Sequence, residues 1–302
     1  MMDAPRSLLT SISSSDRRLD DAPPISRDCW DPWSAYARVV YTEMLCQMIG
    51  RGTFSRVYAV GSYVEKRTSE DMAIRDGLIA PLVNELSLGW DVGVHRMRRG
   101  TKLRGGVREF VDICLQVYKM HRLGIVHNDL KPQNIVMYRG KPQIIDFGAS
   151  RYIREAPVRE EVSIWYRSPE LCTGRTYDLR SDIWSLGCIY YEMMTGKPLY
   201  PHDNVYALVR AHHYKPDGFL RHLLAPKDER WDIVQVLAHF GITVEPLLNP
   251  LDRESLAAWF RAQLPDHGDG RAAADIAARV MWGEDVDVKH VKYMCRLKLP
   301  RM

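Results

Sequence analysis

Two polar sequences separated by a short β-hairpin constrain this chain more than any other feature. The first is HNDLKPQN, which runs from His127 to Asn134, and the second is Asp146-Phe147-Gly148. Between them, NIVMY and QIIDF have the composition of short strands, and Arg139-Gly140-Lys141-Pro142 joins them as a turn. The two polar sequences therefore face each other across a hairpin.

The residues in these two sequences have the chemistry that phosphoryl transfer requires. That reaction needs a carboxylate to accept or orient a hydroxyl proton, and oxygen ligands for Mg²⁺ beside the phosphates. Asp129 suits the first role, Asn134 and Asp146 suit the second, and Lys131 can neutralise charge on the transferred group. A lone aspartate in a loop is usually a turn or cap residue, but the set in this order favours a catalytic site.

A glycine-rich segment nearer the N-terminus, IGRGTFSRV, is a second candidate for phosphate binding. Glycines let the backbone approach phosphate oxygens and point its N–H groups at them, although most such turns between strands are simple hairpins. A dinucleotide site would need a helix directly after the glycines, and here a strand follows. Lys66, in the next strand, can reach phosphates or remain a solvated lysine. The candidate binding residues are Lys66 and, in the loop, Ile49, Gly50, Arg51, Gly52, Thr53, Phe54, Ser55 and Val57.

With the motifs SPE at 168–170 and SDIWSLG at 181–187, the chain resembles eukaryotic protein kinases over about residues 43–302. DLKPQN is similar to the serine/threonine-specific form, and IWYRSPE and EMMTGKPLYP are similar to the cyclin-dependent and MAP kinase branch. The resemblance implies an α+β fold of two lobes, with a small β-rich N-lobe at 36–106 and a larger helical C-lobe at 107–302. Residues 1–35 are rich in Ser, Asp, Pro and Arg, which predicts a flexible tail.

The resemblance also implies a role for each matching residue. Lys66 would bind the α- and β-phosphates of ATP, Asp129 would be the catalytic base, and Asn134 and Asp146 would hold Mg²⁺. Glu85 would pair with Lys66, from a helix that begins at Pro81. Asp182 would be the buried helix aspartate that supports the catalytic loop.

Several positions depart from the family pattern. Ser55 replaces the third loop glycine, and the strands and hinge that hold adenine must fit into about 87–106, where no gatekeeper can be located. The arginine that pairs with Glu170 has no clear match, with Arg271 and Arg279 as candidates.

The phosphorylation switch of the resembled family is also missing on both sides. Asn128 replaces the arginine that gathers the activation-loop phosphate, and Val158 stands at the usual phosphothreonine. We therefore expect an activity that does not depend on phosphorylation of this loop.

Charge and cysteine content exclude other classes. A net charge of +4 is too small for a dedicated nucleic-acid binder, and no apolar run approaches the ~18 residues that a membrane span needs. The sequence also lacks a secretory signal, and its six scattered cysteines predict free thiols in a reducing compartment. We expect an intracellular protein, in the cytoplasm or nucleus. The basic run at 96–108 is either a patch for acidic substrates or nucleic acid, or a solvated loop face.

Three functions remain in competition. The first is a serine/threonine kinase that uses ATP and Mg²⁺ on protein substrates, with any regulatory partner unidentified. The second is a pseudokinase that acts as a binding scaffold, which the shortened hinge region favours and the intact Lys66, Asp129, Asn134 and Asp146 oppose. The third is a small-molecule phosphotransferase, against which Lys131, the glycine of Asp146-Phe147-Gly148 and the SPE motif argue.

Overall fold

The computed structural model divides the chain into two units, residues 1–44 and 45–302, and all the elements below belong to the second. It describes residues 46–52, 54–91, 93–153, 164–173, 178–201, 216–247, 253–263, 275 and 278–279. The predictions for the tail at 1–35, for Thr53, for Val158 and for Arg271 lie outside the described residues.

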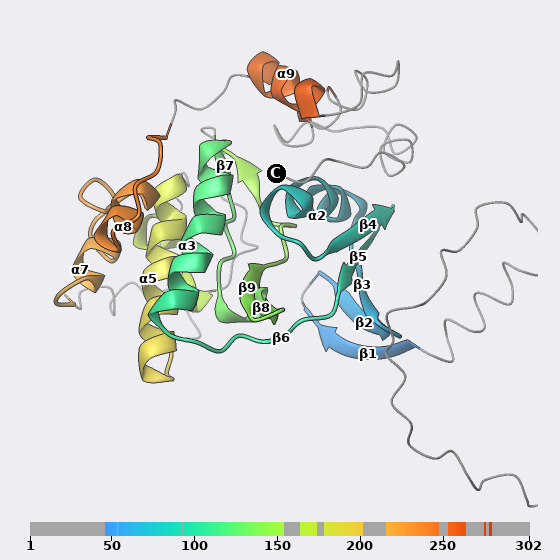
Figure 1. The fold of residues 1–302 in the computed structure, drawn as a ribbon, viewed down its shortest axis with the longest axis horizontal. Coiled ribbons are helices and arrows are strands. Elements are labelled where there is room, and N and C mark those ends of the chain that lie inside the picture. The colour runs from blue at the N-terminus through green and yellow to red at the C-terminus, as the bar shows by residue number, and fades with distance from the viewer. Residues whose placement is uncertain are drawn as a thin grey trace, which may run out of the picture. The chain divides into compact units, whose positions relative to one another are not determined.

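The first part of this unit is an antiparallel five-stranded sheet of order β1-β2-β3-β5-β4 (Figure 1). Its strands are β1 (Cys46–Arg51), β2 (Arg56–Val60), β3 (Tyr63–Arg67), β4 (Ser87–Asp91) and β5 (Val94–Arg98). Short glycine turns join neighbouring strands, and Gly61 between β2 and β3 has a φ of 57°, which glycine adopts at no steric cost. The sequence predicted β1 to β3 from their residues, and the structure confirms them.

Helix α2 (Glu70–Val83) packs against β4 and β5. Ten of its fourteen residues are buried, so the polar face that reveals a surface helix is missing from its sequence. The expectation that this helix begins at Pro81 is wrong: Pro81 lies in its last turn, and the helix starts after Ser69 with two acidic residues, which favour a helix N-terminus. The contact with β4 is close, because a Cβ on Gly77 would lie 2.2 Å from the indole of Trp90.

The segment 87–106, expected to hold a compressed hinge, contains β4, β5 and the short β6 (Thr101–Lys102). Only residues 103–106 separate β6 from helix α3 (Val107–Arg122), so no helix intervenes there. This short connection between β6 and α3 accounts for the small number of residues between α2 and the loop that begins at His127.

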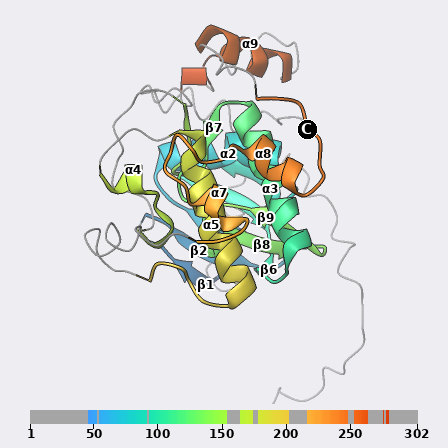
Figure 2. The same ribbon diagram turned by 90° about the vertical axis from the view of Figure 1, so that its left-hand side faces the viewer.

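The rest of the unit is mainly helical (Figure 2). After α3 come β7 (Ile125–Val126), the 3₁₀ turn η1 (Pro132–Asn134), and the hairpin of β8 (Ile135–Tyr138) and β9 (Lys141–Ile144). The elements that follow are β10 (Arg151–Tyr152), η2 (Ile164–Tyr166), α4 (Pro169–Cys172), α5 (Leu179–Thr195), α7 (Leu220–Leu223), α8 (Ile233–His239) and α9 (Arg253–Gln263). The α+β class and the two-part arrangement expected from the sequence are confirmed.

One apolar core joins α2, α3, α5 and α8, and its fully buried members include Leu78, Phe110, Ile113, Trp184 and Val236. Helix α3 begins where its apolar stripe begins, as predicted, because Gly106 precedes it and Glu109 bonds back to the Gly106 N–H at 2.8 Å. Among the described residues, no helix is both long and apolar enough to cross a bilayer. Through this core, the β8–β9 hairpin packs against α3.

Candidate active site

Asp182, on α5, anchors the loop that runs from His127 to Asn134, the catalytic loop. It is 1% exposed, and its two carboxylate oxygens accept from the backbone N–H groups of His127 at 2.8 Å and Asn128 at 3.0 Å. His121 Nε2 lies 3.0 Å from the same carboxylate. Buried hydrogen bonds to a charged group are among the strong ones, so the supporting position expected for Asp182 is confirmed.

The loop turns sharply at Asn128, which has a φ of 72°. Asparagine tolerates this left-handed region better than most residues. The replacement of the family arginine by Asn128 therefore suits the backbone while removing the charge. The rings of His127 and Phe147 lie in contact at a tilted angle, with centroids 5.3 Å apart, which fixes the loop to the second polar sequence.

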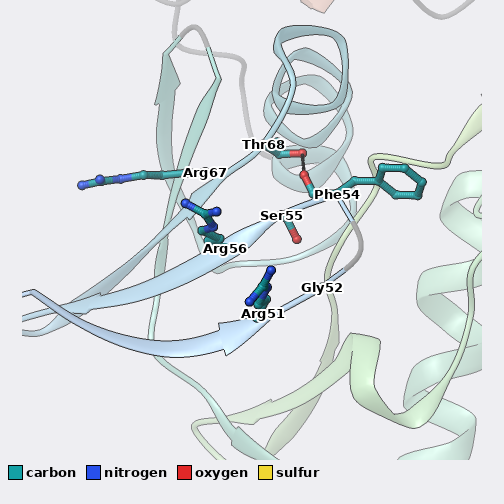
Figure 3. Close-up of a pocket in the computed structure, with 7 residues that line it drawn as sticks. All are labelled: Arg51, Gly52, Phe54, Ser55, Arg56, Arg67 and Thr68. Carbon is teal, nitrogen blue, oxygen red and sulfur yellow. Dashed lines mark hydrogen bonds between the residues drawn. The ribbon is translucent and has the colours of Figure 1, made fainter.

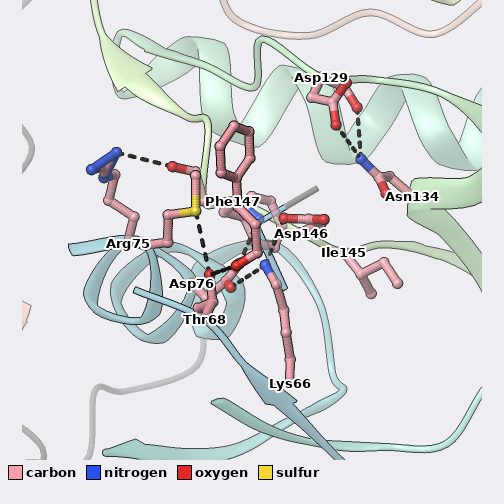
Figure 4. A network of polar contacts seen from close by, with 12 residues as sticks. Lys66, Thr68, Arg75, Asp76, Asp129, Asn134, Ile145, Asp146 and Phe147 are labelled. Atoms are coloured by element: carbon pink, nitrogen blue, oxygen red, sulfur yellow. Dashed lines mark hydrogen bonds and ion pairs between the residues drawn. The ribbon is translucent and has the colours of Figure 1, made fainter. Parts of the chain in front are cut away.

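Asp129, Lys131 and Asn134 form one polar group at the end of the loop. Lys131 Nζ lies 2.7 Å from Asp129 Oδ2, and Asn134 Nδ2 donates to the same oxygen at 3.0 Å and to the Asp129 carbonyl at 2.8 Å. Both bonds use the amide nitrogen of Asn134, so its amide oxygen takes part in neither (Figure 4). The loop and its 3₁₀ turn η1 bring these three residues together.

Lys66 lies between two aspartates, Asp76 of α2 and Asp146, with its Nζ 2.6 Å from each carboxylate (Figure 4). The prediction that Glu85 pairs with Lys66 is wrong. Glu85 follows the end of α2 and is exposed, and its backbone bonds to the side chains of Gln143 and Arg98. Asp76, which sequence reasoning missed, is 0% exposed. The sequence feature that could have revealed Asp76 is an acidic residue in the middle of the mainly apolar stretch AIRDGLIA.

Electrostatics keep this group ionised. Burial alone would lower the pKa of Lys66, but the charges of Asp76 and Asp146 outweigh it and raise the pKa well above its usual range. Burial would likewise raise the pKa of Asp146, and the Lys66 ammonium outweighs it and lowers that pKa. The lysine is therefore a cation and Asp146 a carboxylate at neutral pH.

Helix α2 also contacts the second polar sequence directly. Phe147 N donates to Asp76 Oδ1 at 2.6 Å, and the guanidinium of Arg75 donates to the Gly148 carbonyl at 2.9 Å. Asp146 has a φ of 68°, a strained region that side chains such as aspartate enter at functional sites. Through these bonds, α2 holds Asp146 at the lysine.

The glycine-rich segment forms the β1–β2 hairpin, closed by a bond from Gly52 N to Ser55 O of 2.9 Å. Val57 pairs with Gly50 and with Lys66 across the sheet, so these residues share the face that carries the lysine. Ile49 and Phe54 are exposed. A strand follows the glycines, as expected, and their phosphate-binding role stays a prediction.

Glu170 pairs with Arg230, a partner that sequence reasoning missed. The two Arg230 guanidinium nitrogens lie 2.6 and 3.1 Å from the two carboxylate oxygens, and Arg230 is 1% exposed. The pair joins residues sixty positions apart, and no local pattern around Arg230 marks it as buried. Burial would raise the pKa of Glu170, but Arg230 outweighs it and lowers the pKa.

The donor set suits a hard cation held together with phosphates. Among the described residues, no group of three or more His, Cys, Asp or Glu is placed to bind a metal ion. Mg²⁺ is usually bound through one or two carboxylates plus substrate phosphates. The Asp146 carboxylate, the Asn134 amide oxygen and the adjacent Lys66 fit that mode.

Comparison with known proteins identifies the family. A family model described as protein kinase domain matches residues 101–238, the stretch that contains Asp129, Asn134, Asp146, Glu170 and Asp182. Over these residues the chain matches the protein kinase domain family.

Curated relatives agree with this assignment. The chain is 53% identical over 93 residues to a protein of Encephalitozoon cuniculi named "Probable cell division protein kinase", which covers 29% of this chain and 35% of that protein. It is 45% identical over 94 residues to human "Dual specificity tyrosine-phosphorylation-regulated kinase 4", covering 30% of this chain and 18% of the relative. It is 30% identical over 223 residues to "Serine/threonine-protein kinase PknB" of Mycolicibacterium smegmatis, and this alignment covers 71% of this chain and 31% of the relative.

The matched stretch thus spans about a third or less of each relative's own length. The names of the first two agree with the similarity of the kinase's activation segment to the cyclin-dependent and MAP kinase branch, which the sequence predicted. Lys66 and Asp76 lie before the residues that the family model matches, so their pairing comes from the structure.

Proposed function

We propose that this kinase transfers the γ-phosphate of ATP to serine or threonine hydroxyls of proteins, with Mg²⁺ as cofactor. The observation that carries the proposal is the arrangement of four residues from three separate segments. Lys66 pairs with Asp146, Asn134 bonds to Asp129, and the contact of His127 with Phe147 joins the two groups. A scaffold without activity would have no need of a buried lysine held between two carboxylates, because removing these charges from water is costly.

Each residue has a task in the proposed reaction. Asp129 accepts the proton of the attacking hydroxyl, and Lys131 beside it stabilises negative charge on the transferred group. Lys66, fixed by Asp76, orients the phosphates. Asn134 and Asp146 would hold Mg²⁺, which neutralises phosphate charge when bound.

The free thiols support an intracellular setting, which is part of the proposal. Cys46, Cys114, Cys172 and Cys188 are unpaired, as is usual in a reducing compartment.

The test is incubation with radiolabelled ATP, Mg²⁺ and casein or histone as generic protein substrates. Lys66→Met and Asp146→Asn should each reduce turnover by orders of magnitude, because each removes transition-state stabilisation. Lys141→Gln, at an exposed hairpin position, is the matched control and should retain full activity. Circular dichroism checks that each variant is folded. Near-full activity of Asp146→Asn would show that the proposed roles are wrong.

The same experiment separates the alternatives. Absence of transfer with every substrate would favour a scaffold, and transfer to small metabolites but not to proteins would favour a small-molecule phosphotransferase.

A further inference from the structure

Three arginines lie directly opposite one another on the outer face of the sheet. The strand register pairs Arg51 of β1 with Arg56 of β2, and Arg56 with Arg67 of β3. The next register position pairs Val57 with Lys66, whose side chain reaches Asp146. Because neighbouring residues of a strand point to opposite faces, the arginine row lies on the face away from the lysine.

This arrangement is unfavourable for the sheet by itself. Like charges directly opposite one another on neighbouring strands are destabilising. Arg67 is compensated, because its guanidinium lies 3.2 Å from Glu65 and 4.5 Å from the centre of the Tyr58 ring. Arg51 and Arg56 are exposed, and no carboxylate of the described part of the chain pairs with either. Two opposed cations are therefore left uncompensated on this face.

The two arginines border a concave site of about 390 Å³ (Figure 3). The lining residues are Arg51, Gly52, Phe54, Ser55, Arg56, Arg67 and Thr68. Thr68 Oγ1 donates to the Phe54 carbonyl at 3.0 Å, and this bond, with the one from Gly52 N to Ser55 O, holds the loop in shape. In Figure 3 the Ser55 side chain and the guanidinium groups of Arg51 and Arg56 lie along the same hairpin, and Arg67 extends away from them.

The site is connected to the catalytic residues through two side chains. Thr68 Oγ1 lies 3.3 Å from Met72 Sδ, and a Cβ placed on Gly148 would lie 3.2 Å from Met72 Cβ. The Gly148 backbone therefore packs on Met72, and Gly148 follows Asp146 by two residues. Met72 thus links Thr68, at the edge of the arginine site, to the segment that carries Asp146.

We propose that this arginine pocket binds a phosphorylated serine or threonine of a protein held at the active site. The proposal rests on the proposed function and adds a substrate class: proteins that already carry a phosphate near the acceptor. Guanidinium groups bind phosphate through two parallel hydrogen bonds. A phosphoserine supplies three acceptor oxygens and a charge of about −1.5 to −2, which offsets two opposed arginines better than one carboxylate.

A nucleic acid fits the same face less well. Its backbone needs cations spaced along many phosphates, whereas the neighbouring Arg96 is paired with Glu65 and Arg98 donates to the Glu85 carbonyl. Among the described residues of this face, Arg51 and Arg56 are the arginines that stand directly opposite each other without a carboxylate partner, which suits one phosphate group.

The direct test measures binding of fluorescent peptides to the full chain by anisotropy, with a non-hydrolysable ATP analogue and Mg²⁺ present to occupy the nucleotide site. Three peptides differ at one position, which is phosphoserine, aspartate or serine. The phosphoserine peptide should bind at least tenfold more tightly than the serine peptide, with the aspartate peptide between them. Arg56→Gln should weaken phosphoserine binding at least fivefold, and Arg56→Lys should weaken it less. Lys141→Gln, which also removes one exposed charge, should change nothing.

Equal binding of the phosphoserine and serine peptides, or unchanged binding in Arg56→Gln, would overturn the proposal. Stronger competition by oligothymidylate than by unlabelled phosphopeptide would also overturn it, in favour of a nucleic-acid surface.

Kinetics with the same peptides, each carrying a second serine as acceptor, separate this proposal from the proposed function. A kcat/KM advantage for the phosphorylated peptide that Arg56→Gln removes supports both. Arg56-dependent phosphopeptide binding without any phosphate transfer keeps the pocket and rejects the kinase reaction. Transfer at equal kcat/KM to both peptides, with equal binding, keeps the reaction and rejects the pocket.

Discussion

Replacing Asp76 by asparagine tests the arrangement at Lys66 most directly. Asp76 is fully buried and makes two short bonds, to Lys66 Nζ and to Phe147 N, both at 2.6 Å. Asparagine has the same shape, but only one of its two terminal atoms accepts hydrogen bonds. Either the lysine or the Phe147 N–H must then face an NH₂ group, so one bond is lost.

The cost follows from the kind of bond lost. A hydrogen bond to a charged group contributes about 1.5–3 kcal/mol, and Lys66 retains Asp146 as a partner, so we expect a loss of about 2–3 kcal/mol. For a domain of this size each kcal/mol shifts the Tm by about 2–4 °C. Thermal unfolding should therefore shift down by roughly 4–12 °C. Because a displacement of about 1 Å in a positioning group can reduce turnover 100-fold, kcat/KM should fall by about that factor.

Two further variants sharpen this test. Asp76→Glu keeps the charge and both acceptor oxygens but adds a methylene to a packed site, which costs about 1–3 kcal/mol. It should therefore lose stability and keep more activity than Asp76→Asn. Glu85→Gln, at the position that sequence spacing favoured, should leave both the Tm and kcat/KM unchanged. If Asp76→Asn stays within twofold of the unmodified kinase, or if Glu85→Gln loses 100-fold, the assignment of Asp76 is refuted.

Three other predictions concern pH, buried charge and regulation. Burial lowers the pKa of His95 to about 4, below its value near 6.5 in the unfolded chain, so at acidic pH the unfolded chain binds a proton that the folded chain does not. The free energy of unfolding should therefore fall by about 3 kcal/mol as the pH drops from 6.5 to 4. In urea titrations at several pH values His95→Gln should show a smaller fall, and an equal dependence on pH in both proteins would contradict this. Arg230→Met should reduce the free energy of unfolding by about 3–5 kcal/mol because it leaves Glu170 buried without its charge partner, whereas Glu245→Gln, in an exposed pair, should change it by less than about 1 kcal/mol. Phosphatase treatment of the bacterially expressed protein should leave its rate of phosphate transfer unchanged, since Asn128 carries no charge for a phosphate. A large drop in rate that maps to Ser150, Tyr152 or Ser163 would show that a phosphorylation switch exists.

The catalytic hairpin could be predicted because its determinants are local. Its strands and turn, and the polar residues at its ends, lie within one short stretch from His127 to Gly148. Helix α3 was equally accessible, because its buried residues recur at helical spacing on one side only. A helix with one solvent-exposed face and one buried face can be predicted, because its apolar residues recur at a regular spacing in the sequence.

Helix α2 and the two buried ion pairs could not be predicted in the same way. Burial on nearly every side removed the periodicity of α2, so the count of residues from Lys66 pointed to Glu85 and the structure places Asp76 there. Arg230 meets Glu170 only through tertiary folding, and it ends the charged run KDER at 227–230, which is typical of a surface loop. The side chains that matter most at these sites are fixed by contacts distant in the chain.

The close contact of Gly77 with Trp90 limits how this kinase can be inhibited. Compounds that act by pushing α2 away from the sheet must expose the indole, which is 7% exposed. A tryptophan buries about 150–250 Å², so at about 25 cal/mol per Å² the displacement costs roughly 4–6 kcal/mol. A ligand needs a preference of about 5.5 kcal/mol to reverse a 99:1 population, which is nearly half of the roughly 12 kcal/mol with which a nanomolar ligand binds. Ligands that bind with α2 in its observed position avoid this cost.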